Sequence, residues 1–553
     1  MAGRLDFDVV IVGAGPCGVT TANLLGQYGV RTLVIDQSPT ILNIPRAIGV
    51  CNEGSRVLER AGLANYTRSA LKDIHCVNVN KPDGSLLMKL NSSVLNGYLS
   101  QRTFYQPELE QYLRDALNKY HHVVLRTATE CLQFDDYGDH VSVRIHEQGA
   151  APEQLNCRYL LACDGARSPI RKQLGVEFVG STYSEDWVVV DVAKDPAPSN
   201  EIDVFANTDR PGLTLPAPGG KRRWEFVIKK GECNEVMSSY EKIAELLSPW
   251  GNVEDMQLER RAVYTFNARV ADQFKVGNVF LMGDAAHVTP PFAGQGMMAG
   301  LRDAYNLAWK LAFVIQGRMD HRVLNSYESE RKPQVKQIVN TAKMLGGVIL
   351  PQGIASGLLR DLALKRMAGG KKEKRAEGRR IAKIANHING SRFPMLIKRI
   401  FKKNGHKLGI EFPQNQVINN QRQTVLIDDE LSNDFYIMGY GVNPAEWLSS
   451  ENLRQWRQLG GKFCSIQHDF DQFKVSPSQS PTGYQILFDF QRKYSGLFAG
   501  GKLAIVVRPD RMMVVVAEKA HINGELGCYL TGILPQSSAD KSRVVSRGSG
   551  LVY

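Results

Sequence analysis

The first fifty residues show the pattern of a strand, a tight turn, a helix and a second strand. Val9–Val12 is a short apolar run, which is typical of a strand buried on both faces of a parallel sheet. A glycine-rich turn and a helical stretch to about Tyr28 follow, and Thr32–Ile35 is the next apolar run. This order predicts an α/β domain built on a parallel sheet.

The hydrophobic pattern changes near residue 180. From Trp187 to about Lys229 apolar and polar residues alternate, with a Pro-Ala-Pro-Gly-Gly turn at 216–220. This alternation predicts antiparallel strands and a second, sheet-based layer. A buried-strand pattern returns at 279–282, and a long helix is predicted from about Gly296 to Ile315.

A smaller α/β unit is predicted to begin near residue 424. Its strand candidates are the apolar runs at 435–438, 463–466 and 503–507. The segment Val507-Arg-Pro-Asp-Arg511 belongs to the C-terminal pattern that is compared with a known family at the end of this subsection. The last residues, after about 535, are rich in Ser, Lys and Arg, and we expect them to be frayed.

Positive charge is concentrated in one segment. The chain carries a formal net charge of +12, and residues 360–407 alone contain sixteen Lys and Arg against three Asp and Glu. The rest of the chain is therefore close to neutral. The segment has few aromatic residues and no nucleic-acid-binding signature, so no nucleic-acid partner is predicted. We interpret it as a solvated helical connector; a surface for acidic lipid or for a protein partner is the alternative.

The composition is that of a globular protein with several structural units. The chain has 553 residues, of which 43% are hydrophobic and 22% charged. Nine irregularly spaced cysteines include no Cys-x-x-Cys pair, which argues against a zinc site and a disulfide scaffold. We predict no metal. No apolar run reaches the roughly 18 residues that span a bilayer, and the N-terminus does not resemble a signal peptide. These features predict a cytoplasmic protein that is not integral to a membrane.

The strongest local motif follows the first strand and has the form Gly-x-Gly-x-x-Gly. Gly13 permits the tight turn, Gly15 lets the backbone approach a pyrophosphate, and Gly18 lets the helix pack against the sheet. Asp36 follows Gly18 by 18 residues, where an acid is expected to meet a ribose hydroxyl. The motif predicts a dinucleotide site to which Pro16 and Gln37 also contribute.

Two later motifs distinguish between dinucleotides by resemblance. Asp164-Gly165 and Gly283-Asp284 each follow an apolar strand. Together with the glycine motif, they resemble the three signatures of the group A flavoprotein monooxygenases, the single-component FAD-dependent aromatic hydroxylases. The resemblance implies that Asp284 holds the ribityl chain of FAD and that Asp164 and Gly165 support both FAD and NAD(P)H.

Further segments fit the same family. Arg46, in Pro-Arg-Ala, resembles the arginine that contacts the flavin, and Gln106 resembles the glutamine that holds it. The loop 290–296 resembles the family's loop beneath the isoalloxazine ring, where a helix N-terminus stabilises the anionic reduced flavin. Its predicted contributors are Pro291, Gly294, Gln295 and Gly296. His287 is interpreted as a structural member of the Gly-Asp motif, with a general base as the alternative.

The sequence identifies the residues that act on the substrate less clearly than those that bind the cofactor. In the phenol hydroxylase branch an aspartate is a candidate base, and Asn52 stands where we would expect that acid. We name Asn52, Tyr264 and Pro291 as candidate catalytic residues. Arg222 and Arg223 could meet a substrate carboxylate, but we interpret them as solvated arginines of a hairpin.

The predicted fold is α/β: an FAD-binding Rossmann-like domain with an inserted β-sheet substrate domain and a C-terminal thioredoxin-like domain. The C-terminal pattern resembles the end domain of the phenol hydroxylase branch, here without paired thiols. The expected parts are 1–180 and 271–345 for FAD, 181–270 for the substrate, 346–415 as the basic connector and 416–553 as the thioredoxin-like domain.

The resemblance implies one FAD per chain, with NAD(P)H and O₂ as co-substrates. A flavin C4a-hydroperoxide would then hydroxylate a small aromatic, phenolic substrate, as in the catabolism of aromatic compounds. An N-heteroaromatic or polyketide-like ring is the alternative substrate, and a non-hydroxylating electron-transfer flavoprotein is the alternative class. The chain is expected to act as a monomer or a homodimer.

Overall fold

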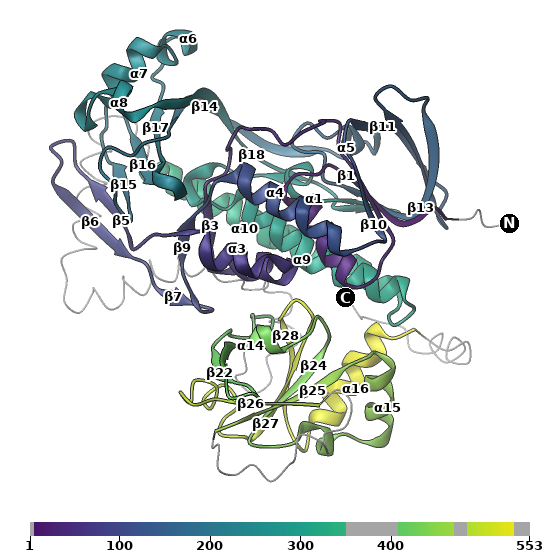
Figure 1. Cartoon of the computed structure of the whole chain (residues 1–553). Helices are drawn as coiled ribbons and strands as arrows, with labels where there is room; N and C mark the ends of the chain where they lie inside the picture. The colour runs from purple at the N-terminus through teal and green to yellow at the C-terminus, as the bar shows by residue number, and fades with distance from the viewer. Residues whose placement is uncertain (1–4, 350–407, 469–483, 536–553) are drawn as a thin grey trace. The chain divides into compact units, whose positions relative to one another are not determined.

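The computed structural model describes residues 5–349, 408–468 and 484–535. Two compact units are distinguished, and each is described by itself (Figure 1). Unit 1 holds the chain up to Gly26, Arg31–Ala304 and the residues from Val335; unit 2 holds Gln27–Val30, Tyr305–Gln334 and the C-terminal residues. The basic segment 360–407 and most of the predicted connector 346–415 lie outside the described residues. No helix in the described ranges is long and apolar enough to cross a membrane.

The first sheet of unit 1 has the predicted strands at its centre. Strand β1 (Phe7–Val12) lies between β2 (Thr32–Ile35) and β13 (Glu153–Ala162), and all three are parallel. The β1 residues Val9–Ile11 are completely buried, which accounts for the unbroken apolar run in the sequence. The sheet is completed by β10 (Val123–Arg126), β11 (Thr129–Asp136), β12 (Val141–Glu147), β19 (Lys275–Val276) and β20 (Val279–Leu281).

Helices follow several strands and loops of unit 1 in the sequence. Helix α1 (Pro16–Gln27) follows β1 directly, and the predicted long helix is confirmed as α9 (Gly296–Ile315). The other helices are α2 (Asn52–Leu58), α3 (Ala64–Ser69), α4 (Gln106–Ala116), α5 (Pro169–Gln173) and α10 (Ser326–Ile349), of which α10 begins in unit 2 and ends in unit 1.

A second sheet of eight strands has the order β21-β18-β14-β17-β16-β15-β5-β6. Its longest strands, β14 (Phe178–Val192) and β18 (Leu258–Ala271), are antiparallel, as are β14 and β17 (Arg222–Val227). The remaining strands are β5 (Cys76–Asn80), β6 (Leu86–Asn91), β15 (Glu201–Phe205), β16 (Gly212–Pro216) and β21 (His287–Val288). Small sheets hold β3 (Gly49–Cys51), β4 (Lys72–Asp73), β9 (Gln101–Thr103), β7 (Val94–Leu95) and β8 (Tyr98–Leu99).

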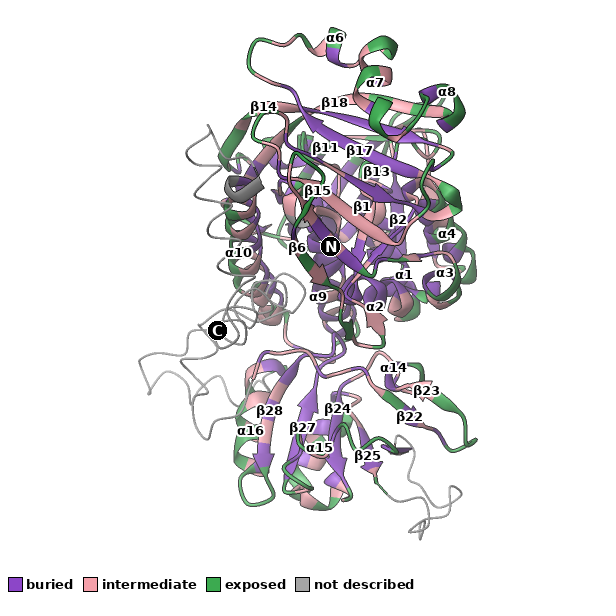
Figure 2. Ribbon diagram, turned by 90° about the vertical axis from the view of Figure 1, so that its left-hand side faces the viewer, coloured by how far each residue is buried: buried purple, intermediate pink, exposed green. Residues whose placement is uncertain are grey.

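The two faces of the second sheet differ in chemistry. On one face Val188, Val190 and Trp224 share a core with Ile243 and Leu247 of the covering helices. These helices are α6 (Asn234–Met237), α7 (Tyr240–Leu247) and α8 (Val253–Met256), and Figure 2 shows buried strands beneath α7 and α8. Side chains alternate along a strand, so Trp187, Val189 and Asp191 lie on the opposite face, which we call the inner face.

Unit 2 contains a seven-stranded sheet with the order β23-β22-β26-β25-β24-β27-β28. Strands β24, β25 and β26 are parallel, whereas β27 is antiparallel to β24 and β28 is antiparallel to β27. All three predicted strands are present as β24 (Tyr436–Tyr440), β25 (Lys462–Gln467) and β27 (Leu503–Val507). The other elements are β22 (Gln416–Ile418), β23 (Thr424–Leu426), β26 (Tyr484–Phe488), β28 (Met513–Glu518), α14 (Ile427–Glu430), α15 (Ser450–Gln458) and α16 (Ile522–Ile533).

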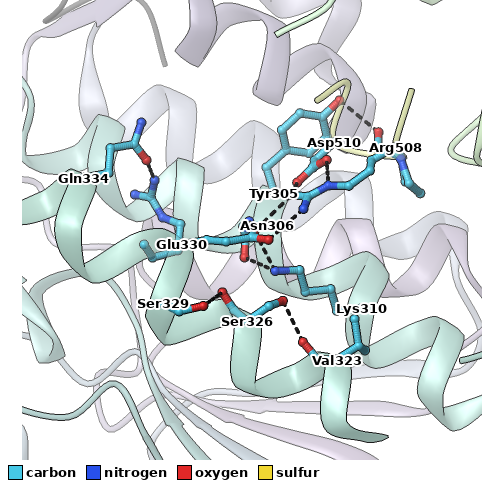
Figure 3. Close-up of polar contacts among 12 residues, drawn as sticks. Tyr305, Asn306, Lys310, Val323, Ser326, Ser329, Glu330, Gln334, Arg508 and Asp510 are labelled. Atoms are coloured by element: carbon cyan, nitrogen blue, oxygen red, sulfur yellow. Dashed lines mark hydrogen bonds and ion pairs between the residues drawn. The ribbon is translucent and has the colours of Figure 1, made fainter. Parts of the chain in front are cut away.

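A buried ion cluster joins three segments of unit 2 (Figure 3). Lys310 of α9 lies with its Nζ 2.8 Å from Oε2 of Glu330 in α10, and its side chain is completely buried. Arg508 donates to both Glu330 oxygens at 2.7 and 3.0 Å and also pairs with Asp510 in the β27–β28 turn. Burial lowers the pKa of Lys310 to about 8, although the charge of Glu330 opposes this shift.

The lowered pKa of Lys310 predicts how stability changes with pH. The folded-state pKa lies below the ordinary lysine value of about 10.4, so the unfolded chain binds more protons between these two values. The contribution of Lys310 to the free energy of unfolding therefore increases as pH rises from about 8 to about 10. Lys310→Met should remove this pH dependence without stranding Glu330, which keeps Arg508.

The test is chemical denaturation of the wild type and Lys310→Met at several pH values from 7 to 10. The difference in unfolding free energy between them should shift in favour of the wild type as pH rises. A difference that stays constant with pH would contradict the assignment. Lys332→Met, at a half-exposed pair with Glu328, is the control and should show no such trend.

Candidate active site

The three glycines of the first motif have different surroundings. Gly13 has a φ of +108°, and a Cβ there would lie 2.2 Å from the carbonyl oxygen of Cys163. A Cβ on Gly18 would lie 2.0 Å from the oxygen of Gly13, so both positions require glycine for close packing. A Cβ on Gly15 would meet nothing within 4 Å. Gly15 therefore leaves free space where helix α1 begins at Pro16, as a pyrophosphate at a helix N-terminus requires.

Asp36 ends strand β2 and organises the same turn. Its Oδ2 accepts a hydrogen bond from the Ala14 amide at 2.7 Å, and its Oδ1 accepts one from the Ser38 amide at 2.8 Å. An ionised carboxylate has about four acceptor positions, so capacity for ribose hydroxyls remains. Gln37 follows as an exposed side chain.

Asp164 has one oxygen that no protein group satisfies. Its Oδ2 accepts from the Ile170 amide at 3.2 Å, whereas its buried Oδ1 has no hydrogen-bond partner among the described residues. Burial raises the pKa of this carboxyl. Gly165 beside it has a φ of +81° and free space around its Cβ position. A ligand that donates to Asp164 would satisfy this oxygen.

Asp284 is reachable by water although protein surrounds it. The residue is exposed, yet burial among neighbouring groups raises the pKa of its carboxyl, while the charges of His287 and Arg46 lower it. Both properties are typical of a side chain that lines a depression. Arg46 is itself exposed. Because its charge lowers the pKa of Asp284, the two residues interact in the fold although they are far apart in the sequence.

The segment that carries Arg46 is held from two sides. Gln106 accepts hydrogen bonds at its Oε1 from the amides of Arg46 and Ala47, at 2.8 and 2.7 Å. Gln106 Nε2 donates to Glu110 at 2.7 Å, so its side chain positions the Arg46 segment. Its predicted direct contact with the flavin stays a prediction.

On the other side, two arginines of the inner face donate to backbone oxygens. Arg223 donates to the carbonyl oxygens of Pro45 and Arg46, and Arg260 donates to that of Pro45. Asp191 orients both arginines, with its Oδ1 at 2.6 Å from Arg223 Nε and its Oδ2 at 3.3 Å from Arg260 Nη1.

The interpretation of Arg222 and Arg223 as solvated arginines is wrong. Arg222 is 5% exposed and pairs with Asp195 at 2.8 Å, and Arg223 is 2% exposed. The alternating pattern of the hairpin did not distinguish these positions from solvent-facing ones, because the opposing carboxylates are about 30 residues away in the sequence. Arg223 is engaged by Asp191 and the Pro45 segment.

The loop before α9 is fixed by a buried arginine. Gln295 is 3% exposed, and its Oε1 accepts from both Nη atoms of Arg302 at 3.0 Å. Arg302 Nε also donates to Glu53 at 2.7 Å. Gly294 has a φ of +60° with free space around it, Gly296 is the first residue of α9, and Pro291 is exposed.

Asn52 begins helix α2 next to this network. The residue is 2% exposed, and its Oδ1 has no hydrogen-bond partner among the described residues. Tyr264 lies on β18 opposite Trp187 of β14, with the Arg260 guanidinium carbon 5.1 Å from its ring centroid. Tyr264 therefore belongs to the inner face, and its catalytic role stays a prediction.

His287 is a buried structural residue in this arrangement. Its Nε2 lies 2.6 Å from Oδ2 of Asp303, and both side chains are completely buried. The same Asp303 oxygen accepts from the Gly283 amide at 3.0 Å, so the pair fixes the start of the Gly-Asp motif. This geometry favours the structural interpretation over a general base.

Sequence reasoning missed Arg302 and Asp303. Both lie within the apolar helix predicted from Gly296 to Ile315, where two adjacent charged residues at buried positions are a signal of polar partners. Arg171 was missed as well: it donates to the oxygens of Ala285 and Ala166 at 2.8 Å and thereby joins the two later motifs.

These residues fit FAD. Gly15 leaves room for a pyrophosphate, Asp164 offers an unsatisfied acceptor, and Asp284 is an accessible carboxyl beside Arg46. Together with the parallel sheet they define a dinucleotide-binding flavoprotein. Residues 6–342 match the family described as FAD binding domain, and the chain belongs to this family. Residues 409–530 match the HcaD C-terminal domain.

The relatives make the class more specific. The chain is 33% identical over 98% of its length to a 3-(3-hydroxy-phenyl)propionate/3-hydroxycinnamic acid hydroxylase of Burkholderia vietnamiensis, of which it covers 99%. It is 31% identical to a hydroxylase of the same name from Klebsiella pneumoniae, over 95% of this chain and 94% of that protein. The predicted membership of the group A flavoprotein monooxygenases is thereby confirmed, and the chain is an FAD-dependent aromatic hydroxylase.

Solved structures share the fold. Aklavinone-11 hydroxylase, in a complex with FAD and aklavinone, has a TM-score of 0.73 and 21% identity over 96% of this chain and 100% of that one. The flavin-dependent monooxygenase PieE, with FAD and substrate, has a TM-score of 0.75 and 18% identity over the same shares of the two chains.

Replacement of Asp284 should weaken FAD binding. A hydrogen bond to a charged group contributes about 1.5–3 kcal/mol, so Asp284→Ala should raise the dissociation constant of FAD about tenfold to a hundredfold. The measurement is fluorescence titration of the apoprotein with FAD. Asp139→Ala, an exposed aspartate next to His140, is the control and should bind FAD like the wild type. An unchanged constant for Asp284→Ala would show that its carboxyl does not contact the cofactor.

Replacement of His287 should affect stability rather than chemistry. His287→Asn shortens the side chain and weakens the buried contact with Asp303, which should cost about 1–3 kcal/mol of unfolding free energy. Holoenzyme that retains FAD should still convert NAD(P)H consumption into hydroxylated product with wild-type efficiency. A variant with normal stability and flavin reduction but without product would instead identify His287 as a base.

Proposed function

We propose that this enzyme hydroxylates a phenol that carries a short acidic side chain, such as 3-(3-hydroxyphenyl)propionate, with NAD(P)H and O₂ as co-substrates. The observation that carries the proposal is the match to hydroxylases of that name over nearly the whole length of both chains. The overall reaction converts an aromatic C–H into C–OH, oxidises NAD(P)H and reduces the second oxygen atom to water.

Bound FAD supplies electron transfer from NAD(P)H and activation of O₂. The chain's own residues bind and orient the groups around it. Gly15 and the N-terminus of α1 would receive the pyrophosphate, Asp36 the ribose hydroxyls and Asp284 the ribityl chain. The backbone amides of the loop at Gly294–Gly296 would stabilise negative charge on the reduced ring.

The second sheet is proposed as the substrate-binding part. The predicted division at 181–270 covers most of its strands, but β5 and β6 come from the segment predicted for FAD. The inner face of this sheet contacts both segments that resemble flavin-contacting segments of the family. Arg223 and Arg260 donate to Pro45, and Trp187 packs against Phe292 of the Pro291–Ala293 turn with ring centroids 5.8 Å apart. A substrate bound against this face would lie beside the flavin, where Tyr264 and Pro291 are the predicted contacts.

The seven-stranded sheet of unit 2 is proposed to be thioredoxin-like and without redox activity. The order β25-β24-β27-β28, with a parallel first pair and antiparallel β27 and β28, supports this fold assignment. Cys464 is buried and Cys528 is exposed, and the described part of unit 2 contains no other cysteine with which either could pair. A docking or dimer surface is the role that remains for this unit.

The proposed function is tested by measuring product and NAD(P)H oxidation together. With 3-(3-hydroxyphenyl)propionate the purified enzyme should consume NAD(P)H faster than without it and form one hydroxylated product, 16 mass units heavier, per NAD(P)H. Phenylpropionate without the ring hydroxyl is the matched control and should give no product, because its ring is not activated. Product from an N-heteroaromatic set but not from phenols would overturn the proposed substrate class.

A further inference from the structure

The inner face of the second sheet carries three rows of residues that lie side by side on neighbouring strands. The first row pairs Trp187 with Tyr264 and Val227, and it contacts the loop before α9 through Phe292. The third row pairs Asp191 with Arg223 and Arg260, and it contacts the carbonyl oxygen of Pro45. The middle row therefore lies between the two segments that resemble flavin-contacting segments.

Glu225 is the titratable residue of the middle row. It lies opposite Val189, two residues along β17 from Arg223 and two from Val227. At about 3.4 Å per residue, it is about 7 Å along the strand from either contact row. Its neighbours on the row, Val189 and Leu213, are apolar.

The Glu225 carboxylate lacks partners of its own. The residue is 8% exposed and its side chain 11% exposed, and no hydrogen bond from a described side chain is among the causes of its pKa shift. Its nearest cation is Nη1 of Arg223 at 3.8 Å, a loose contact, because Arg223 is oriented by Asp191 at 2.6 and 3.0 Å. A mostly buried carboxylate to which no described residue donates a hydrogen bond is free to accept one from a ligand that reaches this face.

A second buried polar group on this face has no partner. Trp187 is 1% exposed, and its Nε1–H donates to no described residue. The inner face thus has a buried donor without a partner among the described residues in its first row and, in its middle row, a carboxylate that remains open to a ligand. A substrate that carries both a hydroxyl group and an acceptor is the kind of ligand that satisfies such a pair.

We propose that Glu225 accepts the proton of the substrate's phenolic hydroxyl group, an inference that rests on the proposed function. Asn52 occupies the position where the family resemblance places an acid, and an amide cannot accept a proton at neutral pH. Glu225 supplies a carboxylate from the inner face of the second sheet. It is the base that sequence comparison alone leaves unassigned.

The proton transfer balances without a further reactant. The phenolic O–H bond breaks as an O–H bond forms on a Glu225 oxygen, and the resulting phenolate activates the ring at its ortho and para carbons. After oxygen is added, the attacked carbon loses its hydrogen as a proton, and Glu225 returns its proton to the phenolic oxygen. No electron passes through Glu225.

The environment of Glu225 suits a base. Burial raises the pKa of its carboxyl, and the charge of Asp191 acts in the same direction, while Arg223 and Arg260 oppose both. A raised pKa brings the proton affinity of the Glu225 carboxylate closer to that of a phenolate and so favours proton transfer from the phenol. The alternative role, neutralising the arginines, is already performed by Asp191, which contacts both of them.

The test compares Glu225→Gln, Glu225→Asp and the wild type as FAD-loaded enzymes with 3-(3-hydroxyphenyl)propionate. Glu225→Gln should retain FAD and its reduction by NAD(P)H, but hydroxylation should fall about 10²–10⁴-fold, with H₂O₂ released in place of product. In the wild type, kcat/KM should decrease as pH falls through the raised pKa of Glu225, and this acidic limb should be absent from Glu225→Gln. Glu225→Asp should recover the acidic limb of the pH profile and part of the hydroxylation rate.

A binding probe separates this inference from the proposed function. 4-Nitrophenol changes colour on ionisation, so the fraction bound as phenolate is read directly, without turnover. If the wild type hydroxylates no phenol, the proposed function fails, and Glu225 is judged by this probe alone. Less bound phenolate in Glu225→Gln than in the wild type supports the inference, and an equal fraction overturns it.

Two further outcomes decide the inference when phenols are hydroxylated. Glu241→Gln, at an exposed residue of α7 on the opposite face, is the control and should match the wild type in rate, coupling and pH profile. A Glu225→Gln enzyme with unchanged coupling and an unchanged acidic limb would overturn the inference. A structural role for Glu225 would give a different result. Glu225→Gln would then lose FAD or thermal stability, and Glu225→Asp would restore both without restoring hydroxylation. This outcome would also overturn the inference.

Discussion

The fixed position of the Pro45–Arg46 segment is the constraint on which the site depends. Arg223 and Arg260 donate to its carbonyl oxygens, and Gln106 accepts from its amides, so the segment is bonded from the second sheet and from helix α4. The bonds that the two arginines donate are charge-assisted, and such bonds are roughly twice as strong as neutral ones. They bring the charge of Arg46 to act on Asp284 and connect the inner face to the FAD-binding part of unit 1.

The first turns of helix α9 carry two buried charged residues that hold parts of the same site. Near its start Arg302 fixes Gln295 and Glu53, and Asp303 fixes Gly283 and His287. Buried ion pairs stabilise little in net terms, since desolvation offsets attraction, but removing one partner is costly. These pairs therefore favour one conformation of the loop before α9 over others.

Much of the fold and the cofactor site could be predicted because their signals are local. Gly13 and Gly18 stand where a Cβ would collide with backbone, so their spacing records the packing of one strand and one helix. The apolar runs of β1, β2 and α9 reflect burial of consecutive residues. Arg222 and Arg223 could not be predicted in this way, because their hairpin sequence is typical of solvated residues. The carboxylates that pair with them in the buried state come from β14 and from the loop that follows it.

The sequence by itself determined that the chain has a dinucleotide site, because the glycine motif requires only a strand, a turn and the helix that follows, and the resemblance of the two later motifs assigned FAD to this site. Tertiary structure alone decided which side chains meet. Gln106 bonds the Arg46 segment, Asp303 holds His287, and Glu225 lies on a row between contacts to two segments that are more than two hundred residues apart in the sequence. The physical reason is that hydrogen bonds and charge pairing depend on distance in space. The register of β14, β17 and β18 sets those distances, and no spacing along the chain records it.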